Sequence, residues 1–311
     1  MSHAGVDRRE RRERRLQLAL FAAALVGLLA GLGWLAISIG QAPLSDVHAY
    51  YDAAARLNHG EPLYAQAATT DEAAFYRYPP LLAIVFRPLA LLPFGVAATI
   101  WELVVLASLV GLVALIRPGF RGWALAGMLT LPILWSVFIG QAQVPVTLLM
   151  AIGRPWSLAL ATHLKILPAL AAIWWIGRRD WRSLGRFVGW TIGLGVLQLV
   201  LEPGGSLAFP GVFNLTQVGE VRNWSPYAVS PALWAILVVI GIGAAWRLAP
   251  TRWGWAAAVA LSVLATPRLL FYQLTSLLAG LRAPEPVAAL PVGVEARQGT
   301  IAASGISGAG S

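Results

Sequence analysis

The 311-residue sequence contains no cysteine, which excludes disulfide bonds, thiolate metal sites and a cysteine nucleophile. Charge is also scarce, because only 12% of the residues are charged, against about 25% in an average soluble domain. The four histidines show no metal-binding spacing, and no glycine-rich phosphate loop of the Rossmann or Walker type is present. The sequence therefore gives no support for a nucleotide or NAD cofactor, and we expect none; a metal ion is not required either, although the carboxylates of Asp46, Asp52 and Glu202 leave one open as an alternative.

No internal repeat is visible, so the two-fold symmetry of many secondary transporters is not indicated. Apolar sequence is abundant: 58% of the residues are hydrophobic, and several runs approach the roughly 20 residues that span a bilayer. We predict an all-α, polytopic transmembrane helical bundle with about 8–10 membrane segments, some of them short or broken. The expected segments are 17–39, 79–93, 95–116, 122–139, 144–176, 186–201, 228–248, 253–265 and 269–281.

The net charge of +9 comes from arginines grouped in short turns between the apolar runs. The positive-inside rule predicts this pattern, whereas a nucleic-acid partner would need one basic face, so we expect none. The chain is predicted to be a multi-pass protein of the cell membrane with a cytosolic basic N-terminus (1–16) and a disordered cytosolic tail (282–311). The membrane domain is then 17–281, with outer loops at 40–79 and 202–227.

The first outer loop contains the leading catalytic candidate. We expect a short helix over 46–58, with Ser45 as its N-cap and Asp46 in its first turn. A carboxylate beside a hydrophobic span lies near low dielectric and can serve as a general base. The alternative is an acid that only interacts favourably with the helix dipole.

Two basic residues are candidates for binding a phosphate. Lys165 is the only lysine of the chain and lies in an apolar stretch, where an ionisable group is costly and indicates a function. Its ammonium suits a lipid-linked phosphate as a point charge, and the alternative is snorkelling to an interface. Arg268 is expected at the outer end of the last span, with a lipid headgroup contact as the alternative.

Other side chains expected near the outer face are candidates for binding substrate through hydrogen bonds or ring stacking. The alternatives are solvated loop residues, an interfacial aromatic belt and polar contacts between packed helices. These candidates are His48, Tyr50, Asp52, Arg77, Tyr78 and Gln141; His163, two residues from Lys165 in the apolar segment 144–176, is a further candidate.

The order of several short motifs is similar to that of a known family. Over residues 15–281 the chain resembles the family-87 glycosyltransferases of the GT-C class, which are polyprenol-phosphate-dependent mannosyltransferases and their relatives. The motifs are Asp46, Tyr50, Ala54, Leu57, Gly60-Glu61-Pro62-Leu63-Tyr64, Tyr78-Pro79-Pro80, Pro88, Leu92-Pro93, Gly140-Gln141, Leu164-Lys165-Ile166-Leu167-Pro168, Thr266-Pro267 and Tyr272.

The resemblance implies an integral membrane fold with an extracytoplasmic active site. It further implies the transfer of a hexose, with mannose expected, from a polyprenyl-phosphate donor to a hydroxyl acceptor, with inversion at the sugar. The acceptor is expected to be a lipid or a glycan, and the chain is expected to contact membrane lipids. Asp46 matches the acid held to be the catalytic base, and Lys165 matches a lysine that is compatible with a place beside the donor phosphate. Two alternatives remain open: a lipid or solute transporter, and a shortened non-catalytic relative that acts as a scaffold.

Overall fold

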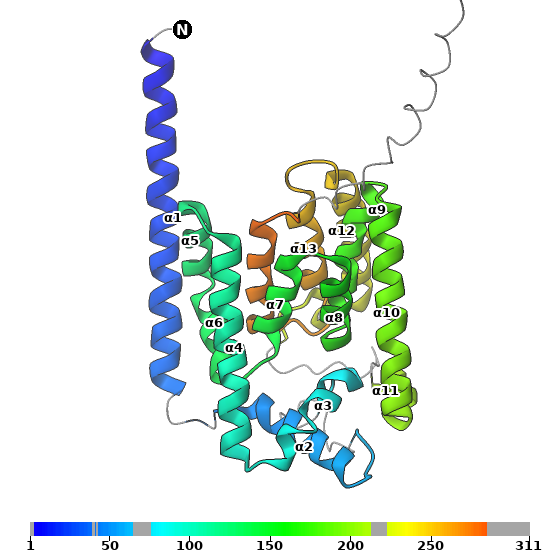
Figure 1. Cartoon of the computed structure of the whole chain (residues 1–311). Helices are drawn as coiled ribbons and strands as arrows, with labels where there is room; N and C mark the ends of the chain where they lie inside the picture. The colour runs from blue at the N-terminus through cyan, green and yellow to red at the C-terminus, as the bar shows by residue number, and fades with distance from the viewer. Residues whose placement is uncertain (1–2, 39–40, 42, 65–75, 213–222, 285–311) are drawn as a thin grey trace, which may run out of the picture.

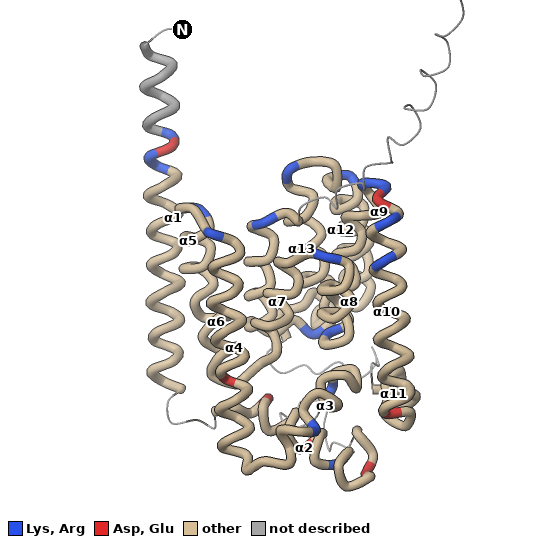
Figure 2. Tube along the Cα trace, in the orientation of Figure 1, with Lys and Arg blue, Asp and Glu red and all other residues tan. Residues whose placement is uncertain are grey.

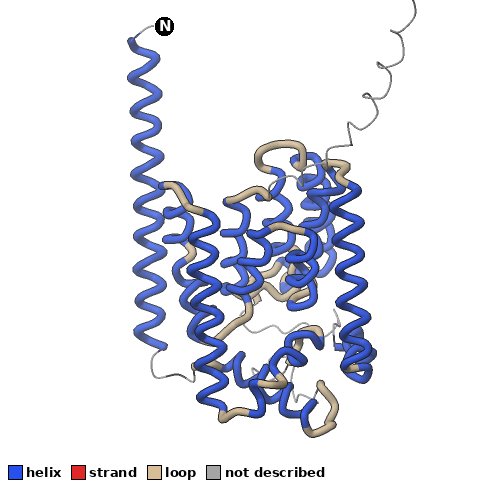
Figure 3. The backbone as a smooth tube through the Cα atoms, in the orientation of Figure 1, coloured by secondary structure: helices blue, strands red, loops and turns tan. Residues whose placement is uncertain are grey.

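The computed structural model describes residues 3–38, 41, 43–64, 76–212 and 223–284 (Figure 1). Within these ranges every regular element is a helix, and no strand is present (Figure 3). The predicted all-α fold class is therefore confirmed. The expected disordered tail lies almost entirely outside the described residues.

The described residues contain four helices that are long and apolar enough to cross a membrane. Their outward-facing side chains include Val26, Val110 and Val239, which are 66–69% exposed. Continuous apolar surface of this kind is stable in lipid and not in water, so the chain is a polytopic membrane protein. The four helices are α1 (His3–Ser38), α4 (Phe94–Ile116), α10 (Trp181–Leu201) and α12 (Pro231–Leu248).

Helix α1 lies at one edge of the bundle and packs on α5 (Phe120–Met128) and α6 (Thr130–Phe138) (Figure 1). These two helices fill the expected span 122–139, but they meet at a bend of 58°. The close packing on α1 depends on Gly27, because a Cβ there would lie 2.5 Å from the Gly127 carbonyl oxygen. Because α1 is one continuous helix, no structural boundary separates the basic N-terminal flank from the first span.

Short helices form the interior of the bundle, and the expected segment 144–176 is one of the predicted broken ones, with Gly153-Arg154-Pro155 interrupting its apolar run. Helix α7 (Gln143–Ile152) ends at Gly153, whose φ of 62° suits glycine. Helix α8 (Pro155–Leu164) begins with its proline and ends where the backbone of Lys165 becomes extended. The other short helices here are η2 (Leu167–Ala172), α9 (Ile173–Gly177), α13 (Gly254–Leu264) and η5 (Phe271–Leu281).

A layer of short helices covers one end of the bundle, at the bottom of Figure 1. Helix α2 (Ser45–Asn58) packs on α4 and on α3 (Pro80–Phe86), which in turn reaches α8 and α10. One face of α2 is buried because Val47, Tyr50, Ala54 and Leu57 recur at helical spacing. The other elements outside the long spans are η1 (Leu89–Leu91), α11 (Pro203–Val212) and η4 (Pro226–Ala228).

The start of α2 corrects one prediction. Ser45 is not the N-cap; Leu44 takes that position in a left-handed conformation, and no side chain caps the helix. Instead, the backbone N–H groups of Leu44 and Asp46 donate to the carbonyls of Phe138 and Ile139 at the end of α6, at 3.0 and 3.1 Å. The unpaired groups of two helix ends therefore satisfy each other, and this contact fixes Asp46 beside the turn that follows α6.

The two ends of the bundle differ in charge (Figure 2). The turns that join α4 to α5, α9 to α10 and α12 to α13 carry arginines, and they lie at the end of the bundle opposite α2 and α3. Acidic residues are found mainly in the layer that contains α2, α3 and α11. The predicted grouping of basic turns on one side is therefore present in the structure.

Candidate active site

Two glutamines at the start of α7 form the centre of the candidate site. Gly140 has a φ of 66°, and the chain then runs through Gln141 and Ala142 into the first residue of α7, Gln143. The side chains of Gln141 and Gln143 are both buried. Gln141 contacts the predicted base, and Gln143 contacts the predicted phosphate-binding lysine. This turn therefore brings the two groups into one site.

The orientation of the Gln141 amide follows from its partners. The backbone N–H of Ala142 donates to the Tyr50 hydroxyl at 3.2 Å, so the hydroxyl proton of Tyr50 is left to donate to Gln141 Oε1, at 2.7 Å. Gln141 Nε2 then faces Asp46 and donates to Oδ2. A charge-assisted hydrogen bond of this kind favours the ionised form of the carboxyl group.

Lys165 orients the second glutamine in the same way, because an ammonium only donates hydrogen bonds. Its Nζ donates to Gln143 Oε1 at 2.6 Å, which turns Gln143 Nε2 toward Ser276 Oγ, also at 2.6 Å. The hydroxyls of Ser276 and Thr147 are 2.8 Å apart, and Thr147 donates to the Gln143 carbonyl at 2.7 Å. The ammonium is thus held by Gln143, whose own side chain and carbonyl are bonded to Ser276 and Thr147, and such polar partners lower the cost of a half-buried charge in an apolar setting.

Tyr78 connects the two halves of the site. Its hydroxyl lies 2.9 Å from Gln141 Nε2, and its ring lies 5.4 Å from the Lys165 ammonium. The ring of Tyr272 in η5 lies on the same ammonium at 4.8 Å. Two aromatic faces near a cation stabilise it by cation–π attraction without taking up its hydrogen bonds. Asp46, Gln141, Tyr78, Lys165 and Gln143 are called the Asp–Lys network below.

The ionisation of Asp46 reflects its half-buried place in this network. Burial raises its pKa to about 6, while the Lys165 ammonium, the Gln141 hydrogen bond and the Arg77 guanidinium each lower it. A carboxyl group with a pKa near 6 is ionised at neutral pH and still accepts a proton well. The arrangement is suited to a general base beside a fixed positive charge.

The two predicted arginines, Arg77 and Arg268, are half-buried. Arg77 precedes Tyr78 and acts electrostatically on Asp46. Arg268 lies between α13 and η5, in a segment held by Asn223: the Asn223 amide donates to the Pro267 carbonyl at 3.1 Å and accepts from the Leu269 N–H at 3.0 Å. Sequence reasoning did not identify this clamp, although Asn223 lies in the predicted second outer loop.

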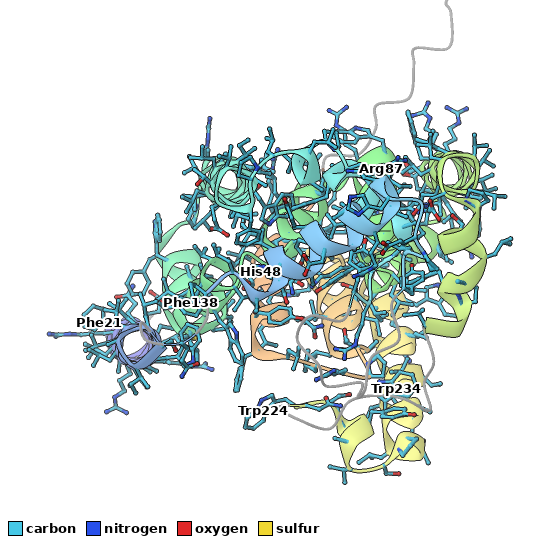
Figure 4. All side chains as sticks on the ribbon, turned by 90° about the horizontal axis from the view of Figure 1, so that it is seen from below. Phe21, His48, Arg87, Phe138, Trp224 and Trp234 are labelled. Atoms are coloured by element: carbon cyan, nitrogen blue, oxygen red, sulfur yellow. The ribbon has the colours of Figure 1, made fainter. Side chains whose placement is uncertain are left out.

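Four other candidates lie away from the centre of the network. His48 is exposed on α2, at the lower face of the bundle (Figure 4), and its ring stacks on Phe94 with centroids 3.7 Å apart. Asp52 is exposed farther along the same helix. Tyr50 is fully buried behind Gln141, which favours a supporting role over contact with substrate. Both ring nitrogens of His163 are bonded to groups on α10.

Several residues of the site were missed by sequence reasoning. Thr147, Ser276 and Gln198 are buried polar side chains within apolar helices. Their hydrogen-bonded contacts join segments more than 100 residues apart, such as Gln143 with Ser276 and Leu81 with Gln198. The sequence did show each of them as a polar residue within an apolar run. That pattern does not indicate which residue of another helix forms the hydrogen bond. In the described part of the chain, no group of three His, Asp or Glu side chains could hold a metal ion.

Comparisons with known proteins identify the family of the chain. Residues 75–283, which include Tyr78, Gln141, Lys165 and Arg268, match the sequence description of glycosyltransferase family 87. The chain belongs to glycosyltransferase family 87. The predicted family is confirmed, while Asp46 lies outside the residues that match. No solved structure matches the chain significantly.

Two curated relatives of this family-87 chain are named polyprenol-phosphate-mannose-dependent alpha-(1-2)-phosphatidylinositol pentamannoside mannosyltransferase. The protein from Mycolicibacterium smegmatis is 33% identical over 190 residues, which cover 55% of this chain and 46% of the relative. The protein from Mycobacterium tuberculosis is 32% identical over 173 residues, which cover 48% of this chain and 40% of the relative. The matches thus span less than half the length of either relative.

Gly140 gives a first test of how the family-87 site is built. A Cβ at this position would collide with Val47 Cγ2 of α2 and lie 2.7 Å from Glu102 Oε1, and the positive φ adds strain. We expect Gly140→Ala to destabilise the protein by about 1–3 kcal/mol and to displace Asp46 from Gln141. Thermal unfolding in detergent and the transfer assay described below measure the two effects.

The control for Gly140→Ala is Gly189→Ala in α10, where a Cβ would meet nothing within 4 Å. Adding Val47→Ala to Gly140→Ala removes the colliding methyl group and should restore part of the loss. Full stability and activity in Gly140→Ala would contradict the proposed packing of α2 on this turn.

Proposed function

We propose that this family-87 chain transfers a mannose residue from a polyprenyl-phosphate donor to a hydroxyl of a lipid-linked glycan acceptor, with inversion at the anomeric carbon. The observation that carries the proposal is the Asp–Lys network, in which one carboxylate and one ammonium are held together by Gln141, Gln143 and Tyr78. Family membership and the names of the two relatives support the donor and the reaction class.

In the proposed reaction Asp46 is the general base. It accepts the proton of the acceptor hydroxyl while that oxygen attacks the anomeric carbon from the face opposite the phosphate. The bond from the anomeric carbon to the acceptor oxygen forms as the bond to the phosphate oxygen breaks. One displacement of this kind inverts the configuration, and the base contributes about 10²–10⁴-fold to its rate.

The leaving group is the polyprenyl phosphate, which gains negative charge as the glycosidic bond breaks. Lys165 and Arg268 are the proposed partners of this charge. Lys165 is held in place by Gln143 and by two aromatic rings before any substrate binds. A positioned charge of this kind costs no reorganisation during the reaction, so its attraction acts on the transition state.

The proposed active site faces the extracytoplasmic side of the membrane. The arginine-rich turns lie at the opposite end of the bundle from α2 and α3, and the positive-inside rule assigns such turns to the cytosol. A polyprenyl-phosphate donor would then present its sugar from the outer leaflet, at the depth of the Asp–Lys network. The network lies between the short helices of the interior and the layer formed by α2 and α3.

The direct test uses purified protein, a labelled polyprenyl-phosphate mannose and phosphatidylinositol mannoside acceptors in detergent or liposomes. We expect a covalent product larger than the acceptor by one hexose, read by mass spectrometry. Movement of the intact donor across a liposome membrane without a product would support the transporter alternative. Absence of both activities, together with co-purification of a longer membrane protein, would support the scaffold alternative.

The rate of transfer should depend on pH through Asp46. A base acts only when it is ionised, and burial raises the pKa of Asp46 to about 6. We therefore expect kcat/KM to rise about tenfold per pH unit as the pH increases up to this value. The measurement is the initial rate at low donor concentration between pH 4.5 and 8. A rate that does not rise between pH 4.5 and 6, as expected for a base with the ordinary aspartate pKa of about 3.9, would contradict the assignment.

A further inference from the structure

A second polar network joins α10 to α8 and α3. The buried Gln198 of α10 accepts a hydrogen bond from the Leu81 N–H in the first turn of α3, at 2.9 Å, and its Nε2 bonds His163 Nδ1 of α8. His163 Nε2 lies 2.9 Å from the Thr191 carbonyl, back on α10. The proposed reaction assigns no step to Gln198.

The direction of each hydrogen bond in this network is determined by its ends. The Thr191 carbonyl only accepts, so the proton of His163 is on Nε2, and Nδ1 is an acceptor. Gln198 must then present its NH₂ group to His163 and its carbonyl oxygen to Leu81, which only donates. Flipping the Gln198 amide or moving the His163 proton to Nδ1 would place two donors or two acceptors against each other. The network therefore favours one arrangement of the three helices.

Both ends of the network lie within three residues of the Asp–Lys network in the sequence. Leu81 follows Tyr78 after two prolines, and Pro80 is the first residue of α3. The Leu81 N–H is one of the donors that the start of a helix leaves unpaired, so the Gln198 oxygen fixes where α3 begins. His163 lies two residues before Lys165, at the end of α8. One glutamine therefore connects the segment that carries Tyr78 to the segment that carries Lys165.

We propose that Gln198, together with His163, is a positioning residue that holds Tyr78 and Lys165 at their distance from each other and from Asp46. This inference rests on the proposed transferase function. It gives His163 a role different from the substrate contact expected from the sequence. It also gives a role to a glutamine in a helix whose other side chains are mostly exposed or half-buried. Neither residue has to touch the substrate in this role.

A double-mutant cycle tests whether the two residues act together. Gln198→Met keeps the length of the side chain and removes both hydrogen bonds, and His163→Leu removes the partner on α8. We expect each variant to lower kcat/KM for the labelled polyprenyl-phosphate mannose about tenfold, the effect of losing one or two buried hydrogen bonds. The double variant should lose little more than either single variant, because the network is already broken.

The single lysine offers a readout that does not need activity. Acetylation of Lys165 by an amine-reactive ester, followed by peptide mass spectrometry, reports how firmly its ammonium is held. We expect faster labelling of Lys165 in Gln198→Met and His163→Leu than in the wild type, again without a further increase in the double variant. Leu197→Met is the matched control, because Leu197 is 44% exposed on the same helix, and it should change neither labelling nor transfer.

The outcomes separate this inference from the proposed function. If Gln198→Met lowers only the unfolding temperature and leaves donor KM, kcat and the labelling rate of Lys165 unchanged, Gln198 is merely structural and the inference is overturned. If the loss of kcat/KM in the double variant equals the product of the two single losses, the two residues act independently and the inference is overturned as well. If the wild type transfers no mannose, the proposed function fails, while the labelling cycle still decides whether Gln198 positions Lys165.

Discussion

Replacing Asp46 by asparagine is expected to lower the rate of mannose transfer by about 10²–10⁴-fold, the usual contribution of a general base. The amide oxygen of asparagine can still accept the hydrogen bond from Gln141 Nε2, so the side-chain geometry and the folded protein should be retained. The loss should appear in kcat at saturating donor, because the base acts in the transition state. The assay is the formation of labelled product by purified protein, with thermal unfolding as the measure of folding.

Glu61→Gln is the matched control for Asp46→Asn. Glu61 is an exposed carboxylate just beyond the other end of α2, so this variant makes the same chemical change in the same layer. We expect it to keep most of the activity. Asp46→Asn with unchanged turnover would remove Asp46 from the mechanism, and equal losses in both variants would show a general effect of charge.

Replacing Lys165 by methionine is expected to lower kcat/KM for the donor by about 10²–10³-fold, the usual cost of removing one group that stabilises the charge of the leaving group. The acceptor KM should change less, because the ammonium is proposed to contact the donor phosphate. A second effect follows from the charge. Lys165 lowers the pKa of Asp46, so its removal should raise that pKa above its present value of about 6. The acid limb of the pH profile should then move to higher pH.

Arg154→Met provides the control for Lys165→Met. Arg154 is exposed and precedes the first residue of α8. Its replacement therefore removes one positive charge from the other end of the same helix. We expect its pH profile and donor affinity to match those of the wild type. Unaltered donor kinetics in Lys165→Met, measured with labelled polyprenyl-phosphate mannose, would show that another group meets the phosphate.

Much of the helical organisation could be predicted because it depends on local sequence. The apolar runs that became α4, α10 and α12 are long enough to identify by themselves, and Gly153-Arg154-Pro155 marked the break between α7 and α8. The error at the start of α2 has a different origin. Ser45 is a good N-cap by type, but carbonyls at the end of α6 satisfy the N–H groups instead, and no local pattern shows that a distant helix ends there.

The candidate site was predictable in its residue types but not in its connections. A carboxylate after the first span, a lone lysine in apolar sequence and a glutamine before an apolar run all proved to lie together. Conversely, the side chains of Tyr50 and His163 proved to be hydrogen-bonded to other groups of the protein. Thr147, Ser276 and Gln198 were not identified from the sequence. Hydrogen-bond partners in a helical membrane protein lie on different helices, so sequence distance carries little information about them.

The sequence by itself determined that this chain is an α-helical membrane protein of glycosyltransferase family 87 with its basic turns on one side. Hydropathy, charge and short motifs are properties of single segments, and each can be read without knowing how the segments pack. Only the tertiary structure decided that Gln141 and Gln143 hold Asp46 and Lys165 in one network. That pairing depends on where five separate segments meet, and burial in an apolar interior makes each polar group find a partner there.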